Sequence, residues 1–272
     1  MSEIIQNPWT RLRSFTNARL ALGRAGDSLP THEVLEFALA HAQARDAVHD
    51  ALDVDSVARD LAASGFQSIA VQSAARDRAE YLKRPDLGRE LSDESRSLLQ
   101  SCHPDPDRRE GEGPALSTNQ SWREASSVLF IIADGLSAIA PARHAIPVLN
   151  AIIPRLGDWN IAPIIVATQT RVALGDEIGE LLKAEVTVML IGERPGLSSP
   201  HSLGIYLTYK PHIGSTDADR NCISNVRPEG LGYEGAAHKL HYLMIAARGL
   251  GRSGVALKDE SYLQRLDESS SS

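Results

Sequence analysis

Residues 128–191 decide the fold, and they read VLFIIADGLSAIAPARHAIPVLNAIIPRLGDWNIAPIIVATQTRVALGDEIGELLKAEVTVMLI. The short apolar runs rich in β-branched residues are Val128–Ile132, Ile161–Val166 and Val186–Ile191. Between them lie two stretches with the apolar spacing of helices, 142–156 and 176–184. Strands that alternate with helices predict an α/β fold with a mostly parallel sheet, because each helix carries the chain back to begin the next strand in the same direction.

The pattern continues toward the C-terminus. We expect a strand at 203–209, a long amphipathic helix at 233–248 and a last strand at 255–257. The glycines of Gly249–Gly254 have the spacing of a dinucleotide-binding fingerprint, but they follow a helix rather than a strand, so they predict a helix C-cap and a turn. Residues 123–272 are therefore expected to form a Rossmann-like α/β domain.

The N-terminal part of the chain shows helical periodicity. Thr31 is a candidate N-cap for a helix over 32–52, and further helices are expected at 54–64 and 74–83. Residues 1–100 are therefore expected to form a small all-helical domain. Residues 101–122 are rich in Pro, Gly and charged residues and contain almost no large apolar side chain, so we expect a flexible linker there.

The composition argues against several classes of function. The chain has 272 residues, 42% of them hydrophobic, and a formal net charge of -7. This charge offers no basic field for nucleic acid, and the apolar runs are too short to cross a membrane. Two cysteines, Cys102 and Cys222, do not supply a zinc site or a disulfide framework, and the first ten residues lack a signal-peptide pattern. We therefore expect a cytoplasmic protein without a metal site.

Four polar loops are the candidate ligand site, because ligands of open parallel sheets bind outside the carboxyl ends of the strands. These loops are 133–135, 169–174, 192–199 and 221–225. The chain has no P-loop and no G-x-S-x-G elbow for serine hydrolase chemistry. The sequence alone thus indicates a binding edge and no catalytic dyad.

Eight blocks of sequence, in order along nearly the whole chain, resemble one enzyme family. They are Phe15–Arg19, Leu22–Thr31, His41–Asp46, Arg84–Gly88, Ala133–Ser137, Arg171–Gly179, Ile191–Pro200 and Asp219–Leu231. Together they closely resemble the small subunit of adenosylcobalamin-dependent ethanolamine ammonia-lyase. The main departures are residues 1–7 and 101–122.

The resemblance implies which residues contact the cofactor. In that family the small subunit covers part of the adenosylcobalamin, and the matching positions are Val172, Glu193 and Cys222. Val172 would pack against the corrin ring or its nucleotide tail, Glu193 would accept hydrogen bonds from the corrin amides, and Cys222 would add a small polarizable contact. By position alone, the ordinary roles are a packing valine, a glutamate paired with Arg194 and a core cysteine.

The resemblance also implies a partner and a reaction. In the family, the substrate pocket and the acid/base residues belong to a large barrel subunit, so this chain would carry no catalytic residue and would join a higher hetero-oligomer. The enzyme would convert ethanolamine to acetaldehyde and ammonia by radical chemistry. It would act in the cytoplasm, and in some hosts inside a bacterial microcompartment.

Two other functions are compatible with the sequence. A stand-alone α/β module would bind a nucleotide or another phosphorylated ligand without radical chemistry. An assembly scaffold for a metabolic compartment would bind partners without needing Glu193 or Cys222. Corrin binding and dependence on a large partner distinguish these alternatives from the family function.

Overall fold

A mixed sheet forms the centre of the molecule. The computed structural model describes residues 7–16, 18–102 and 127–261. The strands are β1 (Ser68–Gln72), β2 (Ser127–Ala133), β3 (Asn160–Ile161), β4 (Ile164–Thr168), β5 (Val186–Gly192), β6 (Leu203–Tyr209) and β7 (Arg220–Val226). Their order is β1-β4-β2-β5-β6-β7, and the short β3 pairs with β2. The pairs among β1 to β5 are parallel, whereas β6 is antiparallel to both β5 and β7.

The sheet is mixed rather than mostly parallel, which corrects the expectation from the sequence. Residues 193–202 alone connect β5 to β6. Parallel neighbours need a crossover of a dozen or more residues, usually with a helix, so this short connection makes β6 return antiparallel. The strand at 203–209 is confirmed, but the expected Rossmann-like topology is not confirmed.

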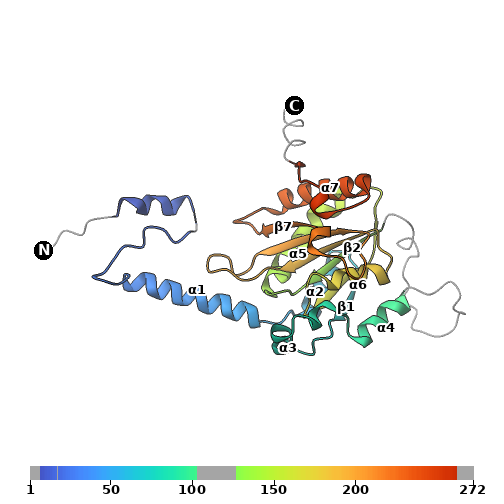
Figure 1. Ribbon diagram of the computed structural model, residues 1–272, viewed down its shortest axis with the longest axis horizontal. Helices are drawn as coiled ribbons and strands as arrows, with labels where there is room; N and C mark the ends of the chain where they lie inside the picture. Colours follow the sequence, from blue (N-terminus) through green and yellow to red (C-terminus); the bar gives the residue numbers. More distant parts are fainter. Residues whose placement is uncertain (1–6, 17, 103–126, 262–272) are drawn as a thin grey trace, which may run out of the picture.

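Helices cover both faces of the sheet and give three layers, whose elements can be followed in Figure 1. α2 (Val54–Ala63), α5 (Ile139–Ile152) and α7 (Tyr233–Leu250) share a core with the strand side chains of one face. α4 (Asp93–Cys102) and α6 (Leu174–Leu181) share a second core on the opposite face. α7 is the amphipathic helix expected at 233–248, and its apolar residues Ala236, Ala237, Leu240, Leu243, Met244 and Ala247 are all buried.

The central strands β2 and β5 are buried along their whole length. They lie inside the sheet, with helices over both faces, so both sets of alternating side chains enter a core. This arrangement explains why their sequences are continuous apolar runs rather than alternating patterns. The strands expected at 128–132 and 186–191 are confirmed.

The N-terminal region is not all-helical, because β1 belongs to it and forms one edge of the sheet. Only Val71 of its five residues is buried, so the sequence lacks a clear strand pattern there. The expected helices at 32–52 and 54–64 correspond to α1 (Thr31–His49) and α2, whereas α3 (Arg78–Lys83) is shorter than expected. Thr31 is the first residue of α1, and the N-cap is Pro30.

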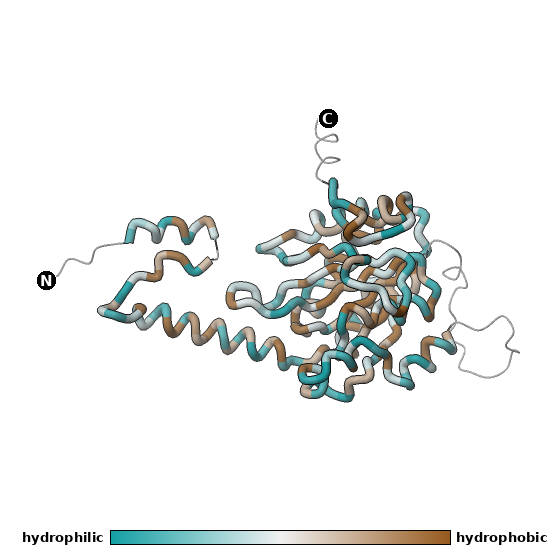
Figure 2. The backbone as a smooth tube through the Cα atoms, viewed as in Figure 1, coloured by the Kyte–Doolittle hydropathy of each residue, from teal (hydrophilic) through white to brown (hydrophobic). Residues whose placement is uncertain are grey.

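An N-terminal arm, residues 7–30 as far as they are described, lies beside α1, which extends away from the sheet (Figure 1). The arm includes the short helix η1 (Pro8–Ser14), and its Arg13 forms an ion pair of 2.5 Å with Glu33 of α1. Nine of the fifteen exposed large apolar side chains in the described residues lie between positions 9 and 39. Figure 2 shows apolar positions distributed along α1 and the arm. The described part of the chain leaves these apolar side chains exposed.

Three further segments differ from expectation. Residues 161–166 are not one strand, since Pro163 separates β3 from β4. Residues 221–225, expected as a loop, belong to β7, an edge strand whose exposed polar side chains hide its strand pattern. Residues 254–256 form the 3-10 helix η6 instead of a strand. The predicted C-cap of α7 is confirmed at Gly251, which has a left-handed φ of 71°.

Within the described ranges, no helix is long and apolar enough to cross a membrane. The flexible linker expected at 101–122 lies outside the described residues except for its first two positions, which complete α4.

Candidate functional site

The loops after β2, β4 and β5 meet at the carboxyl edge of the parallel strands, as expected for a sheet of this class. Together with side chains of α3 and β6 they enclose a pocket of about 430 Å³. Tyr81 of α3, Thr170 and Val172 after β4, Glu193 after β5 and Tyr206 of β6 line this pocket. The carboxyl-edge pocket is therefore the candidate ligand site.

Two glycines let the loops after β2 and β5 touch. Gly135 has a φ of 54°, and a Cβ atom there would lie 2.3 Å from the carbonyl oxygen of Gly192. A Cβ atom on Gly192 would lie 2.0 Å from the carbonyl oxygen of Ser137. Because these neighbours are backbone atoms that no side-chain rotation can move, both positions require glycine. The contact fixes the spacing of the two loops beside the pocket.

Asp134 joins the loops after β2 and β4. It is 1% exposed, and its carboxylate accepts hydrogen bonds from the backbone N–H groups of Gln169 at 2.8 Å and Thr170 at 2.9 Å. Arg78 of α3 donates to the same carboxylate at 3.0 Å and to the carbonyl oxygen of Gly135 at 2.8 Å. Burial raises the pKa of Asp134, and these donors oppose the rise. Asp134 thus connects two strand ends and α3.

Two guanidinium groups pack on the buried ring of Tyr81. Its centroid is 5.0 Å from Cζ of Arg78 and 4.5 Å from Cζ of Arg171. The Tyr81 hydroxyl donates to the carbonyl oxygen of Thr170 at 3.0 Å, and burial raises the pKa of Tyr81 to about 12. The stacking holds Arg171 in the wall of the pocket, where its Nε atom is buried without an acceptor in the described residues.

Of the three predicted cofactor contacts, Val172 and Glu193 line the carboxyl-edge pocket. The Glu193 carboxylate accepts hydrogen bonds from the hydroxyl of Ser202 and from the backbone N–H of Asn225, the latter at 3.3 Å. Among the described residues, Glu193 has no ion pair with Arg194. The surface ion pair considered as its ordinary role is therefore absent from this part of the chain.

The third predicted contact, Cys222, lies one strand beyond the pocket, on β7. Its thiol is exposed, with Sγ 3.3 Å from Oγ of Ser224, so it is not a core cysteine. Cys222 pairs across the strands with Tyr206, which lines the pocket. Burial raises the pKa of Tyr206, and the neighbouring Cys222 and Glu193 add to that rise. A ligand that extends from the pocket past Tyr206 would reach Cys222.

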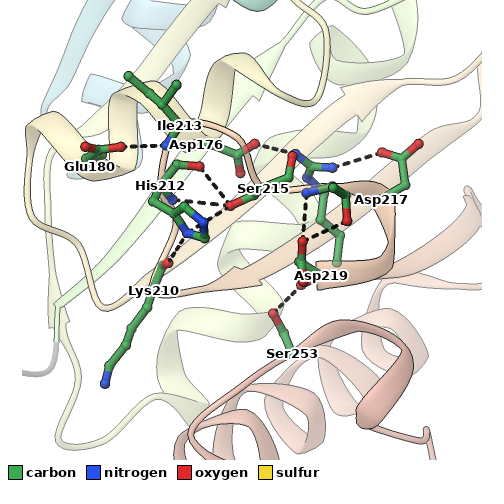
Figure 3. Close-up of polar contacts among 11 residues, drawn as sticks. Asp176, Glu180, Lys210, His212, Ile213, Ser215, Asp217, Asp219 and Ser253 are labelled. Carbon is green, nitrogen blue, oxygen red and sulfur yellow. Dashed lines mark hydrogen bonds and ion pairs between the residues drawn. The ribbon is translucent and has the colours of Figure 1, made fainter.

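A buried arginine at the start of β7 anchors the strand that carries Cys222. Arg220 forms ion pairs with Asp176 of α6, each side chain being 3% exposed, and with Asp217 at 2.9 Å. Burial raises the pKa of Asp176 to about 6, against the opposing effect of Arg220. Figure 3 shows these contacts, together with the hydrogen bonds that order the preceding loop through Asp219. The network holds β7 against α6.

The loop that carries Glu193 is anchored near its other end by His201. Nδ1 of His201 is 3.4 Å from Nε2 of the buried His144 on α5, and Nδ1 of His144 is 2.9 Å from the hydroxyl of Tyr233. Burial lowers the pKa of His144. His144 therefore connects this loop, through His201, to α5.

Tyr81, Asp134 and Arg171 have no individual site role in the expectations from the sequence, although the candidate loops 133–135 and 169–174 contain Asp134 and Arg171. Asp134 directly follows the buried strand β2, which is the signal that marks it, whereas Arg171 lies three residues after the end of β4. Tyr81 carries no such signal, because its contact with the loop after β4 depends on the pairing of β1 with β4. Within the described residues, no group of three or more His, Cys, Asp or Glu residues could hold a metal ion.

Comparison with known proteins identifies the family. Residues 6–258 match the family model described as ethanolamine ammonia-lyase light chain (EutC). The chain is 52% identical over 268 residues to the ethanolamine ammonia-lyase small subunit of Azotobacter vinelandii, which covers 98% of this chain and 93% of that protein. It is 50% identical over 266 residues to the small subunit of Ralstonia nicotianae, with 97% and 93% covered. It is also 50% identical over 264 residues to that of Pseudomonas fluorescens Pf0-1, with 96% and 90% covered. The chain therefore belongs to the ethanolamine ammonia-lyase small-subunit family.

Proposed function

We propose that this chain is the small subunit of an ethanolamine ammonia-lyase, a carbon–nitrogen lyase that converts ethanolamine to acetaldehyde and ammonia. The observation that carries the proposal is the match over residues 6–258, with 52% identity to a named small subunit over nearly the whole chain. A small subunit implies a large one. In this role the substrate pocket and the catalytic residues belong to a large barrel subunit, and this chain helps to bind adenosylcobalamin at the interface.

The carboxyl-edge pocket fits the periphery of that cofactor. A corrin ring carries amide side chains, which both donate and accept hydrogen bonds. The pocket offers the acceptor Glu193, and its lining residue Arg171 has a buried Nε atom without a partner in the described residues. Buried donors are normally hydrogen-bonded, so this atom is available to a ligand. A volume of about 430 Å³ suits one edge of a corrinoid, which agrees with a cofactor shared between two subunits.

Each residue of the site has a distinct role toward the bound cofactor. Adenosylcobalamin, when bound, supplies the radical chemistry that acts on ethanolamine. Val172 packs against its edge and excludes water, Glu193 accepts hydrogen bonds from amide N–H groups, and Cys222 contacts a part that extends past Tyr206. Asp134 keeps the loops after β2 and β4 in place. Orientation of the cofactor and protection from water are thus the contributions of this chain.

The N-terminal arm and α1 form the proposed contact surface for the large subunit. Exposed apolar side chains gather there, such as Phe15 at 78% and Leu35 at 64% exposure, and large apolar patches mark protein interfaces. A hollow of about 760 Å³ lies between this arm and the loop at Leu197. Its three arginines, Arg13, Arg19 and Arg227, already have acceptors within the chain, so this larger hollow suits a partner's side chains better than a polar cofactor.

Several finer predictions accompany this function. The chain is expected to join a higher hetero-oligomer, in the cytoplasm or inside a bacterial microcompartment. The division into residues 1–100, 101–122 and 123–272 stays a prediction. β1 is the element that bears on this division, because it pairs residues 68–72 with a strand of the later part.

Acetaldehyde release from ethanolamine with added adenosylcobalamin tests the proposed function. The reaction is followed with this chain alone, with a cognate large subunit alone and with the two mixed. We expect turnover only in the mixture. If the two proteins associate and bind the corrinoid without turnover, the substrate assignment is wrong; if they never associate, the subunit role is wrong.

A further inference from the structure

Among the buried and half-buried arginines that the structure describes, Arg171 differs because its side chain has no hydrogen-bond acceptor there. Within the described residues, the remaining arginines that are not classed as exposed each donate to a carboxylate or amide oxygen; they are Arg13, Arg78, Arg96, Arg220, Arg227 and Arg248. Arg171 has no side-chain hydrogen bond and no ion pair within these residues, and its Nε atom is buried. A buried donor is costly to leave unsatisfied, so a group from outside the chain is expected to supply the acceptor.

The position of Arg171 is fixed by its surroundings. Its backbone N–H donates to the carbonyl oxygen of Gly88 at 2.8 Å, and its guanidinium carbon lies 4.5 Å from the centroid of the Tyr81 ring. A Cβ atom on Gly88 would come within 3.0 Å of Cγ of Arg171, so the side chain occupies the space that this glycine leaves. The guanidinium is therefore already positioned in the wall of the carboxyl-edge pocket before any ligand arrives.

The charge of Arg171 is not balanced by its neighbours. Arg78, on the same aromatic ring, is neutralised by Asp134 at 3.0 Å. Glu193 lies in the same pocket, but its carboxylate accepts from Ser202 and from the backbone instead. The wall beside Tyr81 thus presents an uncompensated guanidinium, whose planar set of N–H donors suits an oxygen acceptor.

We propose that Arg171 is a further cofactor-binding residue, which donates a hydrogen bond to an oxygen of cobalamin. This inference rests on the proposed function, because it places the corrinoid in the pocket that Val172 and Glu193 line. Two kinds of oxygen in cobalamin offer the required chemistry. One is the carbonyl oxygen of a corrin amide side chain, and the other is the phosphodiester of the nucleotide tail.

The test measures the Kd of the assembled complex of small and large subunits for cyanocobalamin, by equilibrium dialysis with corrinoid absorbance. This readout does not depend on turnover. Arg171→Met removes the donors and keeps an unbranched side chain, whereas Arg171→Lys keeps the charge without the planar fork. Arg252→Met is the matched control, because Arg252 is exposed beyond the end of α7, and no side-chain contact of it occurs in the described residues.

We expect Arg171→Met to raise the Kd about tenfold to a hundredfold, as loss of a charged hydrogen bond does, with Arg171→Lys in between. The Arg252→Met complex should bind like wild type. Cobinamide, which lacks the phosphodiester, then locates the acceptor. An equal loss for cobinamide identifies a corrin amide, and a loss confined to cobalamin identifies the phosphodiester. A Kd for Arg171→Met within about twofold of the control overturns the proposal.

A second measurement uses only the wild-type complex, so it does not depend on how a variant folds. Phenylglyoxal modifies accessible arginines, and mass spectrometry reads the extent at each residue. Bound cyanocobalamin should protect Arg171 while leaving Arg252 unchanged. Equal labelling of Arg171 with and without the corrinoid contradicts the proposal. If the wild-type complex forms but binds no corrinoid at all, the failure lies with the proposed function and is distinguishable from a loss specific to Arg171.

Discussion

Replacement of Asp134 by Asn tests whether one buried carboxylate holds the edge of the sheet together. The change keeps the size of the side chain but removes its charge and one acceptor oxygen. Asp134 accepts hydrogen bonds from the N–H groups of Gln169 and Thr170 at 2.8 and 2.9 Å and from Arg78 at 3.0 Å. In the variant, a side-chain N–H₂ group takes the place of one carboxylate oxygen, so a donor faces a donor. At least one of these buried donors therefore loses its partner.

The contacts allow the size of the effect to be worked out. Leaving a buried N–H group unsatisfied costs about 1–3 kcal/mol, and leaving one charge of a buried pair alone costs about 3–5 kcal/mol. Two effects reduce this loss. Arg78 keeps the carbonyl oxygens of Val48 and Gly135 as acceptors, and removal of the buried carboxylate recovers the desolvation that raises its pKa. We expect the free energy of unfolding to fall by about 3 kcal/mol, at the low end of that range.

Denaturant unfolding and calorimetry of the purified chain measure this change, and a loss of about 3 kcal/mol corresponds to a Tm lower by about 6–12 °C. Asp86→Asn is the matched control, since it breaks an Arg–Asp pair whose side chains are 60% and 58% exposed. Such a surface pair contributes little to the free energy of unfolding, so its removal should leave the unfolding midpoint unchanged. A loss below about 1 kcal/mol for Asp134→Asn, within the range of a surface pair, would refute the role of Asp134 as a buried connection.

Three other perturbations follow from the same structure. Gly192→Ala places a Cβ atom 2.0 Å from a backbone oxygen, so we expect about 1–3 kcal/mol of destabilisation and weaker cyanocobalamin binding by the complex. The control is Gly249→Ala, whose Cβ atom meets open space and which should show neither change. Burial lowers the pKa of His144 below its unfolded value of about 6.5, so the contribution of His144 to stability is present above that pH and is lost as the pH falls. The free energy of unfolding, measured between about pH 7.5 and 5.5, should show this loss. The His144→Gln variant should show a weaker dependence on pH. Leu35→Glu, on the exposed face of α1, should weaken association with the large subunit by about tenfold or more in a sedimentation or pull-down titration, while Ile213→Glu, equally exposed elsewhere, should not. Equal effects of Leu35→Glu and Ile213→Glu would argue against the N-terminal arm as the contact surface.

The parts of the fold that the sequence predicts are those buried on both sides. β2 and β5 read as continuous apolar runs because both faces of each strand enter a core, and α7 shows its buried face at regular helical spacing. The edge strands β1 and β7 were missed because few of their side chains are buried, and periodicity reports burial rather than hydrogen bonding. The direction of β6 depends on the length of one connection, which hydrophobic patterning does not encode.

The candidate site shows the same division between local and long-range information. Glu193 directly follows β5 and Val172 lies four residues after the end of β4, so their position at the carboxyl edge can be expected from the order of elements, while the resemblance implies their role. Cys222 lies on β7 rather than in the expected loop, and it is connected to the pocket through its cross-strand neighbour Tyr206. That relation appears only once the register of β6 and β7 is known.

The residues that support the pocket connect it to the N-terminal half of the chain. Tyr81 and Arg78 come from α3, which follows β1, and they reach Thr170 and Asp134, which lie 89 and 56 residues further along the sequence. Because β1 pairs with β4 in parallel, the end of β1 and the end of β4 lie at the same edge, and the short connection from β1 brings α3 beside the loop after β4. The edge strand that the sequence concealed is therefore what places the buried Tyr81 in the wall of the candidate cofactor pocket and Arg78 against its ring. Binding at this edge and the packing of the N-terminal half are for this reason parts of one arrangement.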